Sequence, residues 1–380
     1  MLEHYHHIHI KNVGSGLRFA TKPGVRDFPE VSAGVLELLK YLESSANIAI
    51  DASHGQGLLA QALLHAGVGE VWQAETARAA LVASHAVLPE QVQQVAQGLW
   101  ELPEASVDAV YLMPDTTKGT RRVEAELVGA FRVLKPAGVL LAAFAKDQGA
   151  KRYEKTAAAL FGSGSVLNKK AAFRVSRYVK KAASMSAEWL EKTSPITFDA
   201  AGLTLTAALG VFAAGKLDAG SEMLLEVLTD EGLLTGAALT GKRALDVGCG
   251  YGVLALKLAL AGAAVTALDD DVLAVKSTAA NAVHYGLDVR CLHADVGKAL
   301  RNERFDVVVM NPPFHVGKQV RLDVPKAFLA TAKERLEPSG VLYLVANAAL
   351  DYESLLNAWG TCHTLRVDKG YKVLKWQPKR

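Results

Sequence analysis

Asp246-Val-Gly-Cys-Gly-Tyr-Gly-Val-Leu-Ala255 is a glycine-rich turn that joins an apolar run to a helical stretch. The sequence around it predicts buried strands over Arg243–Val247 and Ala264–Leu268 and helices over Gly252–Ala261 and Val272–His284. Strand, turn, helix and strand in this order indicate an α/β domain. We expect a mostly parallel sheet with helices on both faces.

The same block occurs a second time, nearer the start of the chain. Asp51-Ala-Ser-His-Gly-Gln-Gly-Leu-Leu-Ala60 aligns with the turn quoted above. Two further pairs of blocks follow in the same order and at nearly the same spacing: Val107–Pro114 with Phe305–Pro312, and Leu134–Leu140 with Leu336–Leu342. Three matches in one order indicate tandem copies of a single fold.

The two copies predict two α/β domains, residues 1–185 and residues 186–380. Residues 182–195 are expected to link them, and the alternating pattern over Thr197–Thr206 predicts a hairpin that begins the second domain.

The composition is that of a globular protein in a reducing compartment. Of the 380 residues, 50% are hydrophobic and 21% are charged, and the three cysteines are too scattered for a disulfide framework or a zinc site. The start of the chain has no apolar signal core, and no apolar run approaches the roughly 20 residues that span a bilayer. We expect a cytoplasmic protein without membrane contact, without a metal, and monomeric.

The second copy carries the residues of a nucleoside-type cofactor site. Glycines 248, 250 and 252 let the backbone approach a ligand closely, and Asp269, at the end of the next strand, is placed to accept both ribose hydroxyls. Asp246 favours a cationic sulfonium cofactor, because it would repel a pyrophosphate. Asp295 and the Ala294 amide are expected to bind an adenine ring, unless Asp295 only caps the following helix.

Phe305–Met310 is a buried strand that leads into Asn311-Pro312-Pro313-Phe314. The prolines stiffen the backbone and remove amide donors, which leaves the Asn311 side-chain oxygen and the Pro312 carbonyl as paired acceptors. Two acceptors orient an aromatic amine toward a methyl donor. Phe314 would stack on its ring, and the following His315 is a candidate substrate contact.

These motifs resemble the class I S-adenosylmethionine methyltransferases that modify exocyclic amines, and more closely the small-subunit (16S) ribosomal RNA guanine-N2 methyltransferases. The resemblance extends to Gly210-Val-Phe212, Leu217-Asp218 and Gly220-Ser221; Leu209 departs from the proline usual there. It implies two tandem Rossmann-like class I methyltransferase domains, with S-adenosylmethionine held by the acids, the glycines and Asn311. The implied substrate is a guanine 2-amino group in ribosomal RNA or the small ribosomal subunit.

Two other functions fit the same motifs. A large-subunit ribosomal RNA guanine-N2 methyltransferase shares this two-domain plan. A non-catalytic RNA-binding assembly factor would keep the cofactor pocket only for stability, which the intact Asn311, Asp246 and Asp269 argue against.

The first copy has lost the chemical residues. Ser53 replaces the first glycine, and Met113-Pro-Asp-Thr116 stands in place of the Asn-Pro-Pro-Phe motif. Residues 146–181 hold ten basic residues against two acids, with aromatic residues interleaved. This basic island predicts that the first domain holds RNA through Lys169, Lys170, Arg174 and Lys180; a solvated helix face is the alternative.

Overall fold

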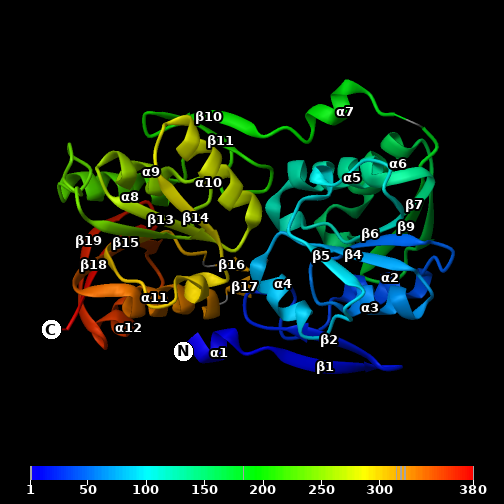
Figure 1. Ribbon diagram of the computed structural model, residues 1–380, viewed down its shortest axis with the longest axis horizontal. Coiled ribbons are helices and arrows are strands. Elements are labelled where there is room, and N and C mark those ends of the chain that lie inside the picture. The colour runs from blue at the N-terminus through cyan, green and yellow to red at the C-terminus, as the bar shows by residue number, and fades with distance from the viewer. Residues whose placement is uncertain (1, 183, 314, 317–318, 321, 380) are drawn as a thin grey trace. The chain divides into compact units, whose positions relative to one another are not determined.

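The computed structural model describes residues 2–182, 184–313, 315–316, 319–320 and 322–379, with no side-chain description for 315, 316, 319 and 320. The chain forms two compact units (Figure 1). One comprises His7–Ser194, and the other comprises Pro195–Arg380 together with Met1–His6. Sequence analysis instead placed the boundary at 185/186 and the whole N-terminus in the first domain. We call His7–Ser194 the first unit and, because it contains the motifs that the sequence predicts to be catalytic, the other the catalytic unit.

The catalytic unit contains a seven-stranded sheet in the order β14-β13-β12-β15-β18-β20-β19, in which β20 runs antiparallel to its neighbours. The strands are β12 (Arg243–Val247), β13 (Ala264–Asp269), β14 (Val289–His293), β15 (Phe305–Met310), β18 (Leu336–Asn347), β19 (Gly360–Asp368) and β20 (Tyr371–Pro378). The central strands β12 and β15 are apolar and almost wholly buried, as expected for a sheet covered on both faces.

Helices cover both faces of this sheet (Figure 1). One face carries α8 (Ala219–Asp230), α9 (Val253–Leu260) and α10 (Val272–His284); the other carries α11 (Asp323–Arg335), α12 (Glu353–Asn357) and the N-terminal α1 (Leu2–His6). Four short strands complete the unit: the hairpin of β10 (Ile196–Ala200) and β11 (Leu203–Ala207), and the pair β16 (His315–Val316) and β17 (Gln319–Val320).

The first unit repeats the plan. Its sheet has the order β5-β4-β3-β6-β7-β9-β8, which matches the catalytic unit strand for strand. The strands are β3 (Ile48–Ala52), β4 (Glu70–Ala74), β5 (Val92–Val95), β6 (Val107–Leu112), β7 (Leu134–Ala145), β8 (Gly164–Asn168) and β9 (Phe173–Val179). One core cluster lies beneath α2 (Ala33–Leu38) and α3 (Leu58–His65), and another beneath α5 (Thr120–Val133) and α6 (Ala150–Phe161). The hairpin of β1 (His9–Gly14) and β2 (Leu17–Thr21) and the helix α4 (Arg78–His85) also belong to this unit.

The predicted α/β fold and its duplication are confirmed. The predicted strand Arg243–Val247 and helix Val272–His284 have the observed bounds, and Thr197 pairs with Thr206 in the expected hairpin. The stretch expected to link the two copies contains the short helix α7 (Ala187–Glu191). Within the described parts of the chain, the helices are too short or too polar to cross a bilayer.

Gly252 shows how tightly the turn of the catalytic unit is packed. Its φ is +92°, and a Cβ there would approach Leu256 and Thr278 to 2.8 Å. We expect Gly252→Ala to lower the free energy of unfolding by about 2 to 4 kcal/mol, because it adds overpacking to the strain of a left-handed backbone. Gly286→Ala is the matched control: φ is +62° but the surrounding space is open. Gly286→Ala should lower the free energy of unfolding by only about 1 to 2 kcal/mol. Urea unfolding measures both variants, and equal losses would contradict this packing argument.

Candidate active site

The candidate site lies where the order of the sheet reverses, between β12 and β15. These two strands are parallel neighbours, with Asp246 opposite Val309 and Val247 opposite Met310. Asn311 follows Met310 directly, so Asp246 and Asn311 lie at the same carboxyl edge. In open α/β sheets, ligands bind in the crevice at this switch point.

The glycine turn is held open by Asp269. One carboxylate oxygen of Asp269 accepts the Gly250 amide at 3.0 Å, and the other accepts the Asp271 amide at 2.9 Å. A Cβ on Gly250 would meet nothing within 4 Å, so the turn faces open space. The predicted role of Asp269 toward the ribose hydroxyls stays a prediction. Asp271 is the N-cap of α10.

Asp246 is fully buried and only half satisfied. Its Oδ2 accepts the Ala255 amide at 3.1 Å, whereas among the described residues its Oδ1 has no hydrogen-bond partner. Burial, with a further contribution from the charge of Asp269, raises the pKa of Asp246 to about 7. An unpartnered buried carboxylate oxygen beside an open turn fits a cationic ligand.

Asp295 follows β14 and is 2% exposed. It is the N-cap of a short 3₁₀ helix, Val296–Leu300, but its side chain makes no capping hydrogen bond, so capping does not account for it. The Ala294 amide, predicted to bind adenine, donates to the Asp269 carbonyl at 2.9 Å. That bond ties the ends of β13 and β14 together.

Asn311 is held in one orientation by α8. Its Nδ2 donates to Asp218 Oδ2 and to Ser221 Oγ, both at 3.0 Å. Asp218 is itself the N-cap of α8 and accepts the Ser221 amide at 3.1 Å. With the nitrogen committed to two acceptors, the Asn311 side chain presents Oδ1 as an acceptor elsewhere. Sequence analysis noted Asp218 and Ser221 only through the family resemblance and gave them no role.

The rest of the predicted motif is described in part. Pro312 is buried and Pro313 is exposed. Phe314 and the side chain of His315 lie outside the described residues, so their predicted roles in substrate binding stay predictions.

Comparison with known proteins gives matches along the whole chain. Residues 202–375 match the family model of the Methyltransferase small domain. The chain is 37% identical over 242 residues to Ribosomal RNA small subunit methyltransferase C of Chromohalobacter salexigens, covering 63% of this chain and 69% of the relative. Against the Marinomonas sp. protein of the same name, identity is 40% over 185 residues, or 47% of this chain and about half (51%) of that relative.

A solved structure extends the match to both units. The T. thermophilus 16S rRNA N2 G1207 methyltransferase, in complex with AdoMet and guanosine, superposes with a TM-score of 0.88 at 36% identity. The alignment covers 100% of this chain and 99% of that chain. The chain belongs to the ribosomal RNA small subunit methyltransferase C family.

In this member of the methyltransferase C family, the turn of the first unit is closed by its own side chains. Ser53 takes the place of Gly248 and donates its amide at 3.0 Å and its hydroxyl at 2.5 Å to Asp51 Oδ1, the counterpart of the unpartnered oxygen of Asp246. A Cβ on Gly55 would approach Ala80 to 2.5 Å, where its counterpart Gly250 faces open space.

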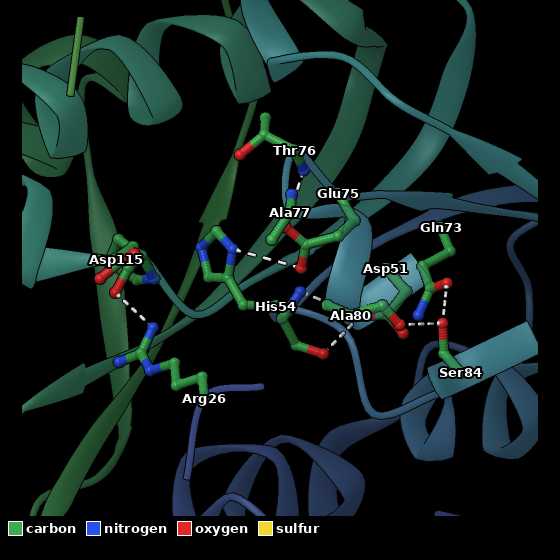
Figure 2. Close-up of polar contacts among 12 residues, drawn as sticks. Arg26, Asp51, His54, Gln73, Glu75, Thr76, Ala77, Ala80, Ser84 and Asp115 are labelled. Atoms are coloured by element: carbon green, nitrogen blue, oxygen red, sulfur yellow. Dashed lines mark hydrogen bonds and ion pairs between the residues drawn. The ribbon is translucent and has the colours of Figure 1, made fainter. Parts of the chain in front are cut away.

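A buried ionic cluster fills the space beyond that turn (Figure 2). In Figure 2, His54 points toward Glu75, whose carboxylate lies 3.7 Å from its Nδ1. His54 also lies 3.6 Å from Glu126, which pairs with Arg122 at 2.7 Å. Burial alone would lower the pKa of His54, but Glu75 and Glu126 outweigh it and raise that pKa. A cavity of about 10 Å³ remains, and its lining includes His54, Thr76, Arg122 and Glu126. That is about the space for one water molecule.

The first unit also lacks an amide side chain at the position equivalent to Asn311. Met113 is 1% exposed, and its sulfur lies 3.1 Å from the hydroxyl of Ser32, the N-cap of α2. Ser32 and Met113 thus replace Asp218 and Asn311 at equivalent elements. A thioether is only a weak acceptor, so this pair holds the helix without offering a site for an amine.

The basic island is only partly a surface. Lys180 is 5% exposed; its ammonium donates to the Leu134 carbonyl at 2.7 Å and lies 4.7 Å from the centre of the Phe131 ring. Arg174 pairs with Glu154 at 2.7 Å. Lys180 is therefore a core residue, contrary to its predicted role as an RNA contact, and Arg174 has an internal partner. Lys169 and Lys170 are exposed as expected.

The aromatic residues interleaved in the island pack inward. Tyr153, Phe161 and Tyr178 are 2% to 5% exposed and belong to the core beneath α5 and α6. They cannot stack on RNA bases. What remains of the island is a set of exposed cations without exposed aromatic partners.

The raised pKa of Asp246 makes a prediction about stability. Since the folded pKa of about 7 lies above the ordinary 3.8, this group's contribution is fully present below pH 4 and is lost as the pH rises through about 7. Between pH 5 and pH 8, the free energy of unfolding should therefore fall by about 2 to 3 kcal/mol less in Asp246→Asn than in the wild type. Chemical unfolding at both pH values, without cofactor, measures this. The exposed Asp288→Asn should follow the wild type; parallel pH profiles for all three proteins would contradict the assignment.

Proposed function

We propose that the protein transfers the methyl group of S-adenosylmethionine to the 2-amino nitrogen of a guanine in small-subunit ribosomal RNA. The observation that carries this proposal is the fixed amide of Asn311, held by Asp218 and Ser221 at the open carboxyl edge beside Asp246. Membership of the methyltransferase C family supports the choice of reaction and of RNA.

The residues of the catalytic unit fit the proposed cofactor. The open space at Gly250 admits a ligand against the backbone, and the unpartnered Oδ1 of Asp246 offers a negative charge to a cationic group. In this proposal Asp269 accepts the ribose hydroxyls and Asp295 accepts the amino group of the base. When bound, S-adenosylmethionine supplies an activated methyl group on a positively charged sulfur.

The chain positions the amine rather than deprotonating it. Asn311 Oδ1 accepts one N–H of the guanine 2-amino group, and the Pro312 carbonyl is the second acceptor. Both lie at the end of β15, a rigid element. The amine then faces the methyl donor with its lone pair available, and its proton becomes acidic after transfer. No strong general base is needed.

The alternatives are less well supported. A large-subunit RNA substrate is consistent with the same motif, but the full-length structural relative is a 16S rRNA enzyme. A non-catalytic assembly factor would have no need to keep the Asn311 amide, which Met113 replaces in the first unit.

Asn311→Ala is the direct test of this function. Loss of a preorganised contact typically lowers turnover about 100- to 1,000-fold, while affinity for S-adenosylhomocysteine should stay within a few-fold. The assay measures labelled methyl transfer to small ribosomal subunits that lack the modification, with N2-methylguanosine identified among the nucleosides. Asp218→Ala should lower turnover as well, because it frees the amide to rotate. The control is Asn357→Ala, which removes the side-chain oxygen that accepts the Cys362 amide. Near-normal turnover of Asn311→Ala would refute the mechanism.

We further propose that exposed lysines of the first unit hold the RNA. Lys146 follows the carboxyl end of β7, and its ammonium donates to the Lys170 carbonyl at 3.2 Å, which places it beside the Lys169–Lys170 turn. All three lysines are exposed. They form a cation cluster at one end of the sheet, suited to phosphates rather than to bases.

Replacing Lys146, Lys169 and Lys170 by Ala should weaken RNA binding without affecting cofactor binding. Each lost phosphate contact should reduce the slope of log affinity against log salt by about 0.7 to 0.9. Lys135→Ala, at the opposite end of the same strand and paired with Asp108, is the control and should leave the slope unchanged. Filter binding of one RNA at several salt concentrations measures both. An unchanged slope in the triple variant would show that this face does not meet RNA.

A further inference from the structure

The N-terminal helix α1 is part of the catalytic unit, although it lies at the far end of the chain from the cofactor motifs. It packs against α11, and Tyr5 is 3% exposed within the same core cluster as Ala294 and Val296. The chain then leaves this unit at His7 to form the first unit. The helix therefore completes the core next to the strand that bears Asp295.

Two side chains of α1 meet Asp295. His6 Nδ1 lies 3.3 Å from Asp295 Oδ2, which makes Nδ1 the protonated nitrogen if it donates. The Tyr5 hydroxyl makes a hydrogen bond to the same carboxylate. Burial raises the pKa of Tyr5 well above its usual value and the charge of Asp295 adds to the shift, so this hydroxyl is a donor at any working pH.

Asp295 lies beside the proposed ribose site. It lies two residues beyond His293, which ends β14 opposite Asp269, and the Ala294 amide between them is bonded to the Asp269 carbonyl. The two acids therefore lie at the same carboxyl edge of neighbouring strands, where open α/β sheets bind nucleosides. Asp295 is 2% exposed and lacks a capping bond of its own, so its carboxylate depends on other groups for its orientation.

We propose that Tyr5 and His6 are positioning residues that fix the Asp295 carboxylate as the acceptor for the adenine 6-amino group of the cofactor. The proposal rests on the proposed function, because it takes the ligand to be S-adenosylmethionine. A carboxylate can accept two donors from α1 and still accept an amine. The N-terminal helix thereby contributes to recognition of the base without touching the cofactor.

The test compares two probes that differ at the base: S-adenosylhomocysteine and its inosine analogue, in which an oxygen replaces the 6-amino group. Calorimetry gives both dissociation constants for the full-length wild type, Tyr5→Phe and His6→Ala. Tyr5→Phe keeps the ring in the core and removes only the hydroxyl. His4→Ala is the matched control on the same helix, since His4 is exposed.

The wild type should prefer the adenine probe. Each of the two variants should weaken adenine binding by about 3- to 10-fold, the effect of one lost hydrogen bond, and bind the inosine probe as before, so that the preference for adenine falls. His4→Ala should keep the wild-type preference. Weakening of both probes by the same factor would show that α1 only stabilises the fold. Tighter binding by the variants would show that α1 obstructs the site. Either result overturns this inference alone, whereas a wild type that binds neither probe overturns the proposed function with it.

Discussion

The carboxyl edge between the first and fourth strands of each sheet is the constraint on which both units depend. Connections leave that edge toward opposite faces, so the fold leaves a crevice there in every copy. The side chains at the carboxyl ends of β12 and β15 determine whether the crevice can bind a ligand. In the catalytic unit an aspartate oxygen without a partner and a fixed amide line it. In the first unit the equivalent positions satisfy one another.

The closed crevice of the first unit is a stable structure in its own right. Asp51 receives the hydrogen bonds that Asp246 lacks, and the imidazole of His54 lies between two carboxylates. Arg122 is also satisfied: it pairs with Glu126 and lies 4.9 Å from the centre of the Trp100 ring. Mutual pairing lowers the cost of burying these charges, although one side-chain atom each of His54, Glu75 and Glu126 has no hydrogen-bond partner among the described residues. The duplicated domain keeps its fold after losing the chemistry, and its surface is available for another task.

Much of the catalytic unit could be predicted because its signals are local. The apolar run before Asp246, the glycines after it and the strand before Asn311 fix the order of elements, and parallel pairing then brings these residues to one edge. Asp218 and Asn311 are brought together by the tertiary packing of α8, and the spacing of the two residues in the sequence does not predict their hydrogen bond. The contact of His6 with Asp295 joins residues 289 positions apart and is equally hard to predict from the sequence.

The basic island was misread in part for a physical reason. A lysine has a long apolar stem, and Lys180 uses it to lie over an aromatic ring while its ammonium finds a backbone carbonyl. Charge counted along the sequence cannot separate such a residue from its exposed neighbours. The same holds for Tyr153 and Phe161, which alternate with cations in sequence but face the core.

The central claim is that one fold occurs twice and that only the catalytic copy keeps a working site. Calorimetric titration of the full-length chain with S-adenosylhomocysteine tests it most directly. The account predicts one bound molecule per chain, with binding greatly weakened by Asp269→Ala and unchanged by Glu75→Ala. Two molecules per chain, or binding that survives Asp269→Ala and is lost in Glu75→Ala, would contradict it.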